Sequence, residues 1–199
     1  MNESNSTKVV IGVVRLSYVH AFQPEAVGNN TDKKYSVSLI IPKSNTALVN
    51  QIKAAIINAF NAGVGIFGGK APAKGTWKNP LRDGDIERPD DEAYKDSYFI
   101  NASSKTAPGV VKLNPTGNPK YITIDAAHSD ELYSGCYGYV SVNFFAFNNS
   151  GNKGIAAGLN NILKVKDGDF LGGRATAESD FANVEIDANI PDDEDDLPF

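Results

Sequence analysis

The stretch CYGYVSVNFFAFNN, residues 136–149, constrains the fold more than any other part of the sequence. Two sets of residues alternate along it with a period of two, as on the two faces of a β-strand. A turn signal, NNSGNKG at 148–154, separates it from a second alternating segment at 155–165. The pattern predicts a long β-hairpin. The first set is Val140, Val142, Phe144 and Ala146, and the second is Tyr137, Tyr139, Ser141, Asn143, Phe145 and Phe147.

Further short strands are indicated by β-branched and aromatic runs that end at Gly, Pro or Asn. The first of them is either buried on both faces or curved, with a bend at Gly12. On the second arm of the hairpin, one face is predicted to hold Ile155, Ala157, Leu159, Leu163 and Val165. The other predicted strands are 7–20, 34–42, 97–104, 109–113 and 120–124.

The period changes at 44–62, where apolar residues recur at helical spacing. Ser44 or Asn45 can cap the start of this helix, and Gly63 can end it. From Gly63 to about Asp96 the sequence is rich in Gly and Pro and predicts a long irregular loop. Loops of that length are usually functional or mobile. The apolar face of the helix is Leu48, Ile52, Ala55, Ile56 and Ala59.

Many short strands with one helix between them predict a mainly β fold. The simplest arrangement is an OB-fold-like small β-barrel with one inserted helix, at about 44–62, and a long loop. We assign residues 1–179 to this domain. Residues 180–199 show no periodic pattern and are predicted to be a disordered acidic C-terminal tail.

Charge is distributed unevenly along the chain. The net charge of −5 would by itself argue against a nucleic-acid partner, but eight of the 24 acidic residues lie from Asp180 onward, where no basic residue occurs. Residues 1–179 therefore carry about +3. A mildly basic body joined to an acidic tail is typical of interaction proteins.

The end of the tail, DDEDDLPF, combines a block of carboxylates with an apolar tip. Solubility alone would explain the charge but not the tip. A peptide that binds partner proteins explains both, because the carboxylates steer it to a basic rim while the aromatic ring fills a pocket. The same tail could compete with DNA for the protein's own basic groove. Its predicted partner-binding residues are Asp192, Asp193, Glu194, Asp195, Asp196, Leu197, Pro198 and Phe199.

No catalytic constellation is evident, and we expect no cofactor and no metal site. GVGIFG at 63–68 matches G-x-G-x-x-G but follows a helix, so the context of a dinucleotide site is missing. The sole cysteine, Cys136, lies in a predicted strand, and the two histidines are far apart in sequence. The carboxylates of 83–92 alternate with Arg82 and Arg88 in a Pro/Gly-rich segment, which favours a solvated charged loop over a two-metal site.

Aromatic and basic residues form the most informative functional pattern. The second face of the 136–149 strand offers aromatic rings where a solvated face should be polar. Bases of single-stranded DNA stack on such rings while Lys and Arg follow the phosphates. Alternatively, helix 44–62 or a partner subunit covers these rings. The predicted DNA-binding residues are Trp77, Lys78, Arg82, Tyr98, Lys105, Tyr137, Tyr139, Phe145 and Phe147.

The tail resembles the C-terminal tip of bacterial single-stranded DNA-binding proteins. The body is more similar to tailed-phage single-stranded DNA-binding proteins, on the segments LRDGD (81–85), YFINASS (98–104) and GCYGYVSVNFFAFNNSGNKGIAAGLNNILKVKDGDFLGG (135–173). The resemblance covers most of residues 8–181. It implies an OB-fold, sequence-independent binding of single-stranded DNA, no enzymatic activity, and a role in phage replication or recombination.

The resemblance also implies where the protein works and with what. The partners would be single-stranded DNA and, through the tail, phage or host replication proteins such as a polymerase or a helicase-primase. We expect the cytoplasm of a bacterial host and no membrane, and a homodimer is one option for the oligomeric state, which the sequence leaves open. Two alternatives remain: a metal-dependent nuclease that uses the 83–92 carboxylates, and a phage structural protein.

Overall fold

The computed structural model describes residues 6–26 and 31–172, and the proposed tail at 180–199 lies outside them. In the described residues, eight strands form one sheet in the order β3-β4-β2-β1-β7-β8-β5-β6. The strands are β1 (Lys8–Ala26), β2 (Lys33–Pro42), β3 (Arg82–Asp83), β4 (Ser97–Ser104), β5 (Gly109–Leu113), β6 (Tyr121–Thr123), β7 (Tyr137–Asn149) and β8 (Asn152–Lys166). The helices are α1 (Thr46–Ala62), α2 (Gly84–Glu87) and the 3₁₀ turns η2 (Glu92–Tyr94) and η3 (Ala126–Glu131).

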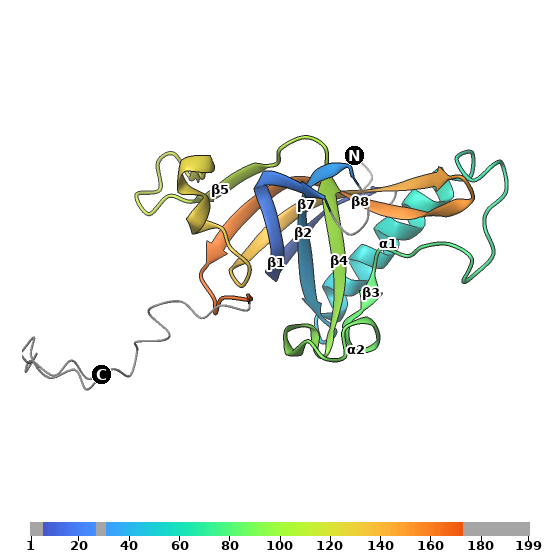
Figure 1. The fold of residues 1–199 in the computed structure, drawn as a ribbon, viewed down its shortest axis with the longest axis horizontal. Coiled ribbons are helices and arrows are strands. Elements are labelled where there is room, and N and C mark those ends of the chain that lie inside the picture. The colour runs from blue at the N-terminus through green and yellow to red at the C-terminus, as the bar shows by residue number, and fades with distance from the viewer. Residues whose placement is uncertain (1–5, 27–30, 173–199) are drawn as a thin grey trace, which may run out of the picture.

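Five of these strands close into a barrel (Figure 1). β1 pairs with β2 and β7, β2 with β4, and β7 with β8, all antiparallel. A short parallel pairing between β4 and β8, at Ala102 and Ala157, closes the ring. The chain therefore has the predicted mainly β architecture of an OB-fold-like barrel with one inserted helix.

The long hairpin forms as predicted. β7 and β8 pair along their full length to Asn149 and Asn152, and Ser150 and Gly151 between them both have positive φ. Positive φ at both central residues is the requirement of a tight hairpin turn. Val140, Val142 and Phe144 are buried in the barrel, whereas Tyr139 and Phe145 of the other set are exposed.

The prediction for the second arm of the hairpin is wrong beyond Leu159. Ile155, Ala157 and Leu159 are buried as expected, but a bulge shifts the register of β8 after Leu159. An extra residue in a strand turns the following side chains to the opposite face. Ile162 therefore enters the core in place of Leu163, and Val165 is exposed.

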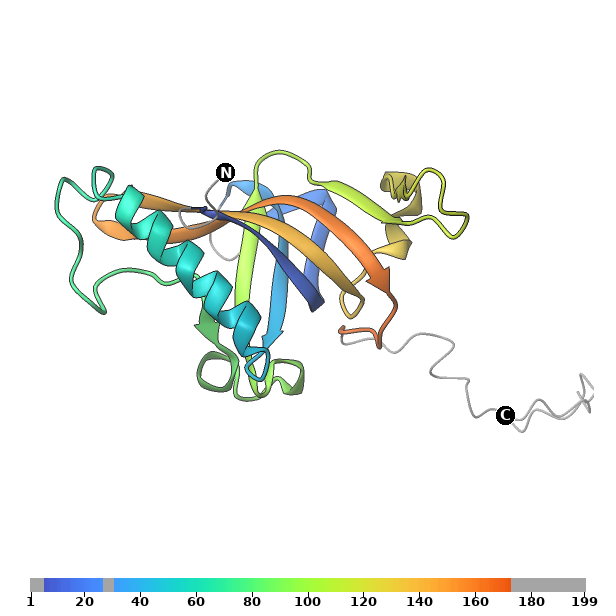
Figure 2. The same ribbon diagram turned by 180° about the vertical axis from the view of Figure 1, so that it is seen from behind.

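Helix α1 begins after Asn45, whose side chain accepts a hydrogen bond from the Leu48 N–H, and ends at Gly63. Its buried face contacts β1, β7 and β8 and completes the main core (Figure 2). Gly63 lies so close to Ala146 that a Cβ at Gly63 would come within 2.2 Å of the Ala146 Cβ. The helix therefore packs on the inner face of β7. None of the described helices has the length and apolar character needed to span a bilayer.

The predicted long loop is irregular only as far as about residue 81. From Arg82 the chain forms β3, α2 and η2 and folds over the outer face of β2 and β4. There Tyr94 and Phe99 meet edge to face, with ring centroids 5.2 Å apart, and enclose Ile40 in a second small core. The Gly and Pro content of this segment gave no hint of its packing, because the contacts come from distant β2 and β4.

Candidate nucleic-acid interface

A groove of about 490 Å³ lies on the barrel along β1, β2 and β4. Ser36 and Ser38 of β2 pair with Ser103 and Asn101 of β4 and form its polar floor. In OB-folds, the face made by the second and third barrel strands binds oligonucleotides, and β2 and β4 are those strands here. The lining residues are Tyr18, His20, Glu25, Ala26, Asp32, Lys34, Ser36, Val37, Ser38, Arg88, Asn101, Ala102 and Ser103.

One end of the groove is made by an aromatic-cation cluster. Tyr18 of β1 has 52% of its surface exposed, and its hydroxyl accepts a hydrogen bond of 3.1 Å from Arg88 Nη1. The Arg88 guanidinium also lies 4.6 Å from the centre of the Tyr94 ring and 5.3 Å from that of Phe99. Arg82, one of the predicted residues, covers the Phe99 ring at 4.7 Å.

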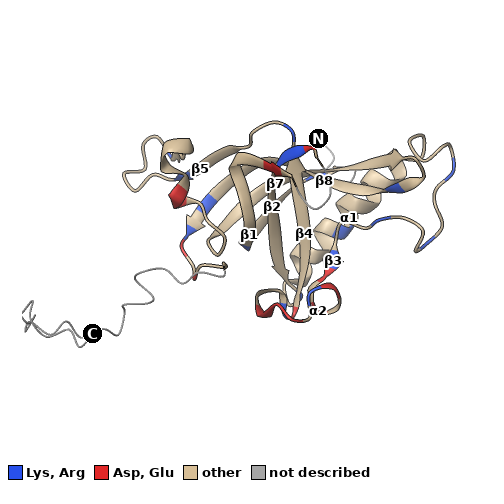
Figure 3. Ribbon diagram, viewed as in Figure 1, with Lys and Arg blue, Asp and Glu red and all other residues tan. Residues whose placement is uncertain are grey.

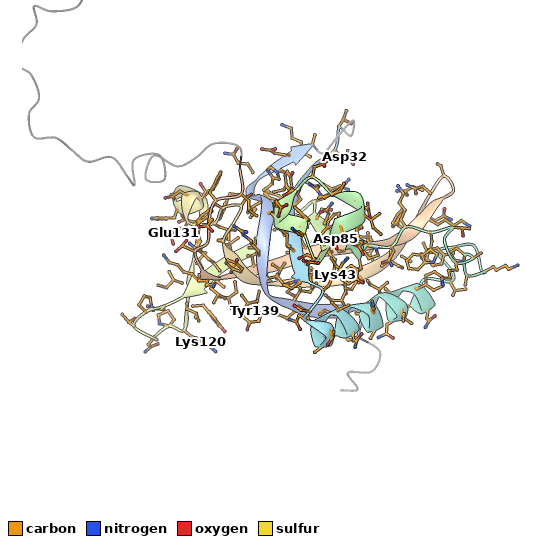
Figure 4. All side chains as sticks on the ribbon, turned by 90° about the horizontal axis from the view of Figure 1, so that it is seen from below. Asp32, Lys43, Asp85, Lys120, Glu131 and Tyr139 are labelled. Carbon is orange, nitrogen blue, oxygen red and sulfur yellow. The ribbon has the colours of Figure 1, made fainter. Side chains whose placement is uncertain are left out.

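The carboxylates of 83–92 are occupied in holding their own segment in place. Lys43 Nζ lies 2.6 Å from both Asp83 Oδ1 and Asp85 Oδ2, as Figure 4 shows for Lys43 and Asp85. Asp85 also accepts the Asp96 N–H at 2.8 Å. The hydrogen bond from Lys43 holds the pKa of Asp85 below its ordinary value, and both carboxylates raise the pKa of Lys43.

The remaining acidic residues of this segment have similar roles. Glu87 forms an ion pair with Arg82, and Asp91 caps η2 while lying 3.9 Å from Arg88. Glu92 lies 3.7 Å from Lys95, and Asp90 is exposed. Across residues 6–26 and 31–172, no three His, Cys, Asp or Glu side chains form a group that could hold a metal ion. Most of these carboxylates are therefore paired with neighbouring cations, in a segment that is folded and not the solvated loop that the sequence predicted.

Trp77 lies away from the groove. Its ring packs against Phe60 of α1, with centroids 4.9 Å apart, and contacts the main core. The backbone of Lys78 pairs with β8, since its N–H donates to Lys153 O and its carbonyl accepts the Ile155 N–H. Trp77 therefore anchors the 63–81 loop to α1, and the Lys78 backbone anchors it to the hairpin.

Tyr98 and Lys105 lie at different places along β4. The Tyr98 ring has the ammonium groups of Lys43 and Lys53 at 5.2 and 5.7 Å, so it belongs to the side of the barrel that α1 occupies. Lys105 follows the end of β4 and lies 3.4 Å from Asp32, which lines the groove. Of the predicted residues, Lys105 therefore borders the groove through Asp32, and Arg82 reaches only the Phe99 ring that Arg88 also contacts.

The aromatic residues of β7 face outward on a separate surface. Tyr139 and Phe145 have 37% and 46% of their surfaces exposed, and Phe147 is half-buried. Tyr137 lies between Lys166, whose Nζ is 4.6 Å from its ring centre, and Arg15 at 5.9 Å. Helix α1 does not cover these rings because it packs on the opposite face of the strand.

This outer face has a charge pattern suited to a polyanion. Residues 8–24, 137–149 and 152–166 contain no Asp or Glu, but they carry Lys8, Arg15, Lys153, Lys164 and Lys166. Of these, Lys164 is paired with Asp167, just beyond β8, at 2.7 Å. Figure 3 shows this contrast, with acidic residues gathered around α2 and basic ones on β8. β7 lies across the barrel from β2 and β4, so the structure divides the predicted residues between two surfaces.

None of the thirteen residues that line the groove was among the predicted DNA-binding residues, and those that matter most to the site are Tyr18, Lys34, Arg88 and Asn101. The only signal for them was the alternation of Ser and Asn in 36–38 and 101–103, which marks a polar strand face. The exposure of Tyr18 could not be predicted from the alternation of β1, because the register of this strand shifts between Ser17 and His20.

Comparison with known proteins identifies the family. The sequence model described as Enterobacter phage Enc34, ssDNA-binding protein, matches residues 7–195. The chain belongs to this family. Protein p50 of Acyrthosiphon pisum secondary endosymbiont phage 1 is 30% identical over 184 residues, which cover 90% of this chain and 95% of p50.

Solved structures of phage single-stranded DNA-binding proteins share the fold. The bacteriophage Enc34 protein in complex with ssDNA is 23% identical, with a TM-score of 0.71 over 86% of this chain and 96% of that one. The bacteriophage T7 protein gp2.5 is 16% identical, with a TM-score of 0.53 over 92% of this chain and 97% of its own. As a member of the Enc34 family, the chain therefore keeps the barrel of these proteins at low sequence identity.

Proposed function

We propose that this protein binds single-stranded DNA without sequence preference, through the groove on β1, β2 and β4. The observation that carries the proposal is a polar groove lined by an exposed tyrosine, Tyr18, and a lysine, Lys34, on the OB-fold face of a member of the Enc34 family. Hydroxyl and amide groups can meet any base edge, and cations can follow the phosphates. Arg82 and Lys105 extend the basic border of this path.

The outer face of β7 is a second surface for the same ligand. Tyr137, Tyr139, Phe145 and Phe147 offer rings for stacking, and the absence of Asp and Glu from the surrounding strand segments spares a phosphate backbone from repulsion. Trp77, Lys78 and Tyr98, which we also expected to contact DNA, lie beside α1 or the hairpin, and they would meet DNA only where a bound strand extends beyond the groove.

We propose further that residues 1–179 form the DNA-binding domain and that residues 180–199 are an acidic tail attached to it. Leu171 packs against the Ile40–Tyr94–Phe99 cluster, so the described chain ends close to the groove. A flexible segment of 20 residues extends about 25 Å. The tail, from Asp192 to Phe199, would compete with DNA for the groove and would recruit phage or host replication proteins when DNA displaces it.

The biological setting follows from this function. We infer a role in phage DNA replication or recombination in the cytoplasm of the bacterial host, with no enzymatic activity and no required cofactor. A homodimer would present two grooves, but the proposal does not depend on it.

The test is a fluorescence-anisotropy titration of labelled oligo-dT at several salt concentrations. We expect binding that weakens with salt, with a log–log slope of about −0.7 for each phosphate neutralised. The same strand is incubated with Mg²⁺ or Mn²⁺ and should keep its length. Absence of binding at low salt would overturn the proposal, and a shortened strand would favour a nuclease instead.

A further inference from the structure

Tyr18 is held in an unusual backbone conformation at the edge of the groove. Its φ is +46°, in a region that residues other than glycine rarely occupy. Its neighbours are fixed on both sides: Leu16 exchanges backbone hydrogen bonds with Gly135 and Cys136, and the Val19 N–H donates to Ser134 Oγ at 3.2 Å. Such conformations persist where the surroundings determine them, and they are common at ligand-binding sites.

The Tyr18 side chain is fixed by a residue from a different part of the fold. The guanidinium carbon of Arg88 lies 4.9 Å from the centre of the Tyr18 ring, while Nη1 donates to the Tyr18 hydroxyl. A ring held by both a stacking contact and a hydrogen bond has little freedom to rotate. With half of its surface exposed, Tyr18 still presents area for stacking to the groove.

Arg88 itself is poorly placed to bind a phosphate. Its guanidinium is shared among the rings of Tyr18, Tyr94 and Phe99 and lies 3.9 Å from Asp91. The side chain is only 28% exposed. Lys34, on the neighbouring strand β2, is the groove cation better placed to meet a phosphate. The contacts of Arg88 therefore suit the support of an aromatic platform.

We propose that the Tyr18 ring is a base-binding subsite of the groove and that Arg88 is the residue that positions it. The ligand is a base of single-stranded DNA, which stacks on Tyr18 with its edge over Asn101 and Ser36. Stacking makes no use of base identity, so the subsite accepts any base. This inference rests on the proposed function, and it adds a residue-level assignment that can fail independently.

The direct test places a reporter in the subsite. Tyr18→Trp adds a second tryptophan to a chain whose own Trp77 is packed against Phe60. We expect oligo-dT to quench the new emission of Tyr18→Trp and to change the emission of the parent protein little. Equal responses of the two proteins to DNA would show that no base stacks at position 18.

Affinity and salt dependence separate stacking from phosphate contact. Tyr18→Ala should weaken oligo-dT binding on the order of tenfold, as expected for a lost base–aromatic stack, with an unchanged salt slope. Arg88→Lys should cause a similar loss, again with an unchanged slope, because it keeps the charge but not the planar support. Lys34→Met is the matched control, in which the slope should become shallower by about 0.7.

Thermal unfolding of each variant checks that it is folded. Tyr18→Phe removes only the hydroxyl and is the variant that alters the subsite least. Full affinity in both Tyr18→Ala and Arg88→Lys would overturn the subsite. A slope that becomes shallower by about 0.7 in Arg88→Met would assign Arg88 to a phosphate instead. If the parent protein binds oligo-dT in these cases, the subsite fails and the proposed function stands. A parent protein that does not bind overturns both.

Discussion

At the scale of single residues, neighbours in one strand have opposite roles. Phe144 is 1% exposed and lies in the main core, whereas Phe145 next to it is 46% exposed on the outer face. Only the alternation of the strand separates them. A Phe→Ala substitution at Phe144 therefore tests the stability of the core, and the same substitution at Phe145 tests DNA binding by the outer face.

We expect Phe144→Ala to lower the free energy of unfolding by about 3–5 kcal/mol, because it leaves a cavity in the barrel. Phe145→Ala should cost about 1 kcal/mol or less, since its ring is half exposed. Urea unfolding measures both. In the oligo-dT titration, Phe145→Ala should weaken binding if the outer face of β7 contacts DNA. Unchanged affinity in Phe145→Ala would confine DNA to the groove.

His128 and Asp125 form an exposed pair whose pH dependence can be predicted. The His128 ring nitrogen Nδ1 lies 2.8 Å from Asp125 Oδ1, and this contact raises the pKa of His128 above its ordinary value of 6.5. A raised pKa means that the pair stabilises the fold at pH values below the ordinary pKa and loses this effect as the pH rises through the folded value. The contribution is small because both groups are solvated.

NMR titration of the His128 ring protons measures this directly. We expect a midpoint above the ordinary value in the parent protein and a return toward it in Asp125→Asn. A His128 midpoint that does not move in Asp125→Asn would contradict the pairing.

At the scale of elements, the 82–96 segment is fixed to the barrel by a few ionic contacts. Lys43, just after β2, joins Asp83 and Asp85, and Asp85 in turn accepts the Asp96 N–H. This segment also carries Arg88, so its position determines one end of the groove. Loss of the Lys43 contacts should therefore affect the segment before it affects the barrel.

We expect Lys43→Met to speed hydrogen exchange at the Asp96 amide severalfold at neutral pH, with little change in β7. The lowered pKa of Asp85 sets the pH dependence: its stabilisation is present above the ordinary value of 3.8 and is lost as the pH falls through the lower folded value. The parent and Lys43→Met should therefore converge in acid. Lys112→Met, which removes an ion pair with Glu131 in another part of the fold, is the control and should leave exchange at Asp96 unchanged.

The elements that sequence reasoning predicted well are those whose pattern is local. The alternation of 136–149 and the capped period of 44–62 depend on neighbouring residues, and both elements formed within two residues of the expected ends. The bulge in β8 and the packing of 82–96 depend on residues far along the chain, so no local period reports them. The groove was missed for the same reason: Arg88 and Tyr18 are 70 positions apart and meet only in the fold.

At the scale of the whole molecule, two candidate surfaces lie on opposite sides of one barrel. The groove contains Glu25 and Asp32 among its lining residues, whereas the strand segments around the outer face of β7 contain no carboxylate. Charge alone would draw an acidic tail to the face of β7, but Leu171, near the end of the described chain, packs beside the groove. We therefore expect the tail to compete at the groove.

Removing residues 180–199 tests this idea. We expect the 1–179 protein to bind oligo-dT severalfold more tightly at low salt, because eight competing negative charges are gone. The difference should vanish near 1 M salt, where charges are screened within about 3 Å. Equal or weaker binding by the shorter protein at low salt would contradict competition by the tail.

Deleting Phe199 alone separates recruitment from competition. The acidic block remains, so oligo-dT affinity should stay within about twofold of the parent value, while capture of a replication polymerase or helicase-primase should be lost. Pull-down from infected cells with immobilised parent and Phe199-deleted proteins measures the second effect. Retained capture by the deleted protein would show that the tip is not the contact.

The order in which the barrel closes has a consequence for synthesis on the ribosome. Lys8 of β1 pairs with Asn143 of β7, and Ala102 of β4 pairs with Ala157 of β8. Each of these pairings can form only after the later strand has been synthesised. At 5–20 residues per second, the first strand has an open edge for on the order of ten seconds or more. During that interval the nascent chain exposes unpaired backbone groups. We therefore expect chaperone capture, rather than early domain formation, to protect this protein while it is being made.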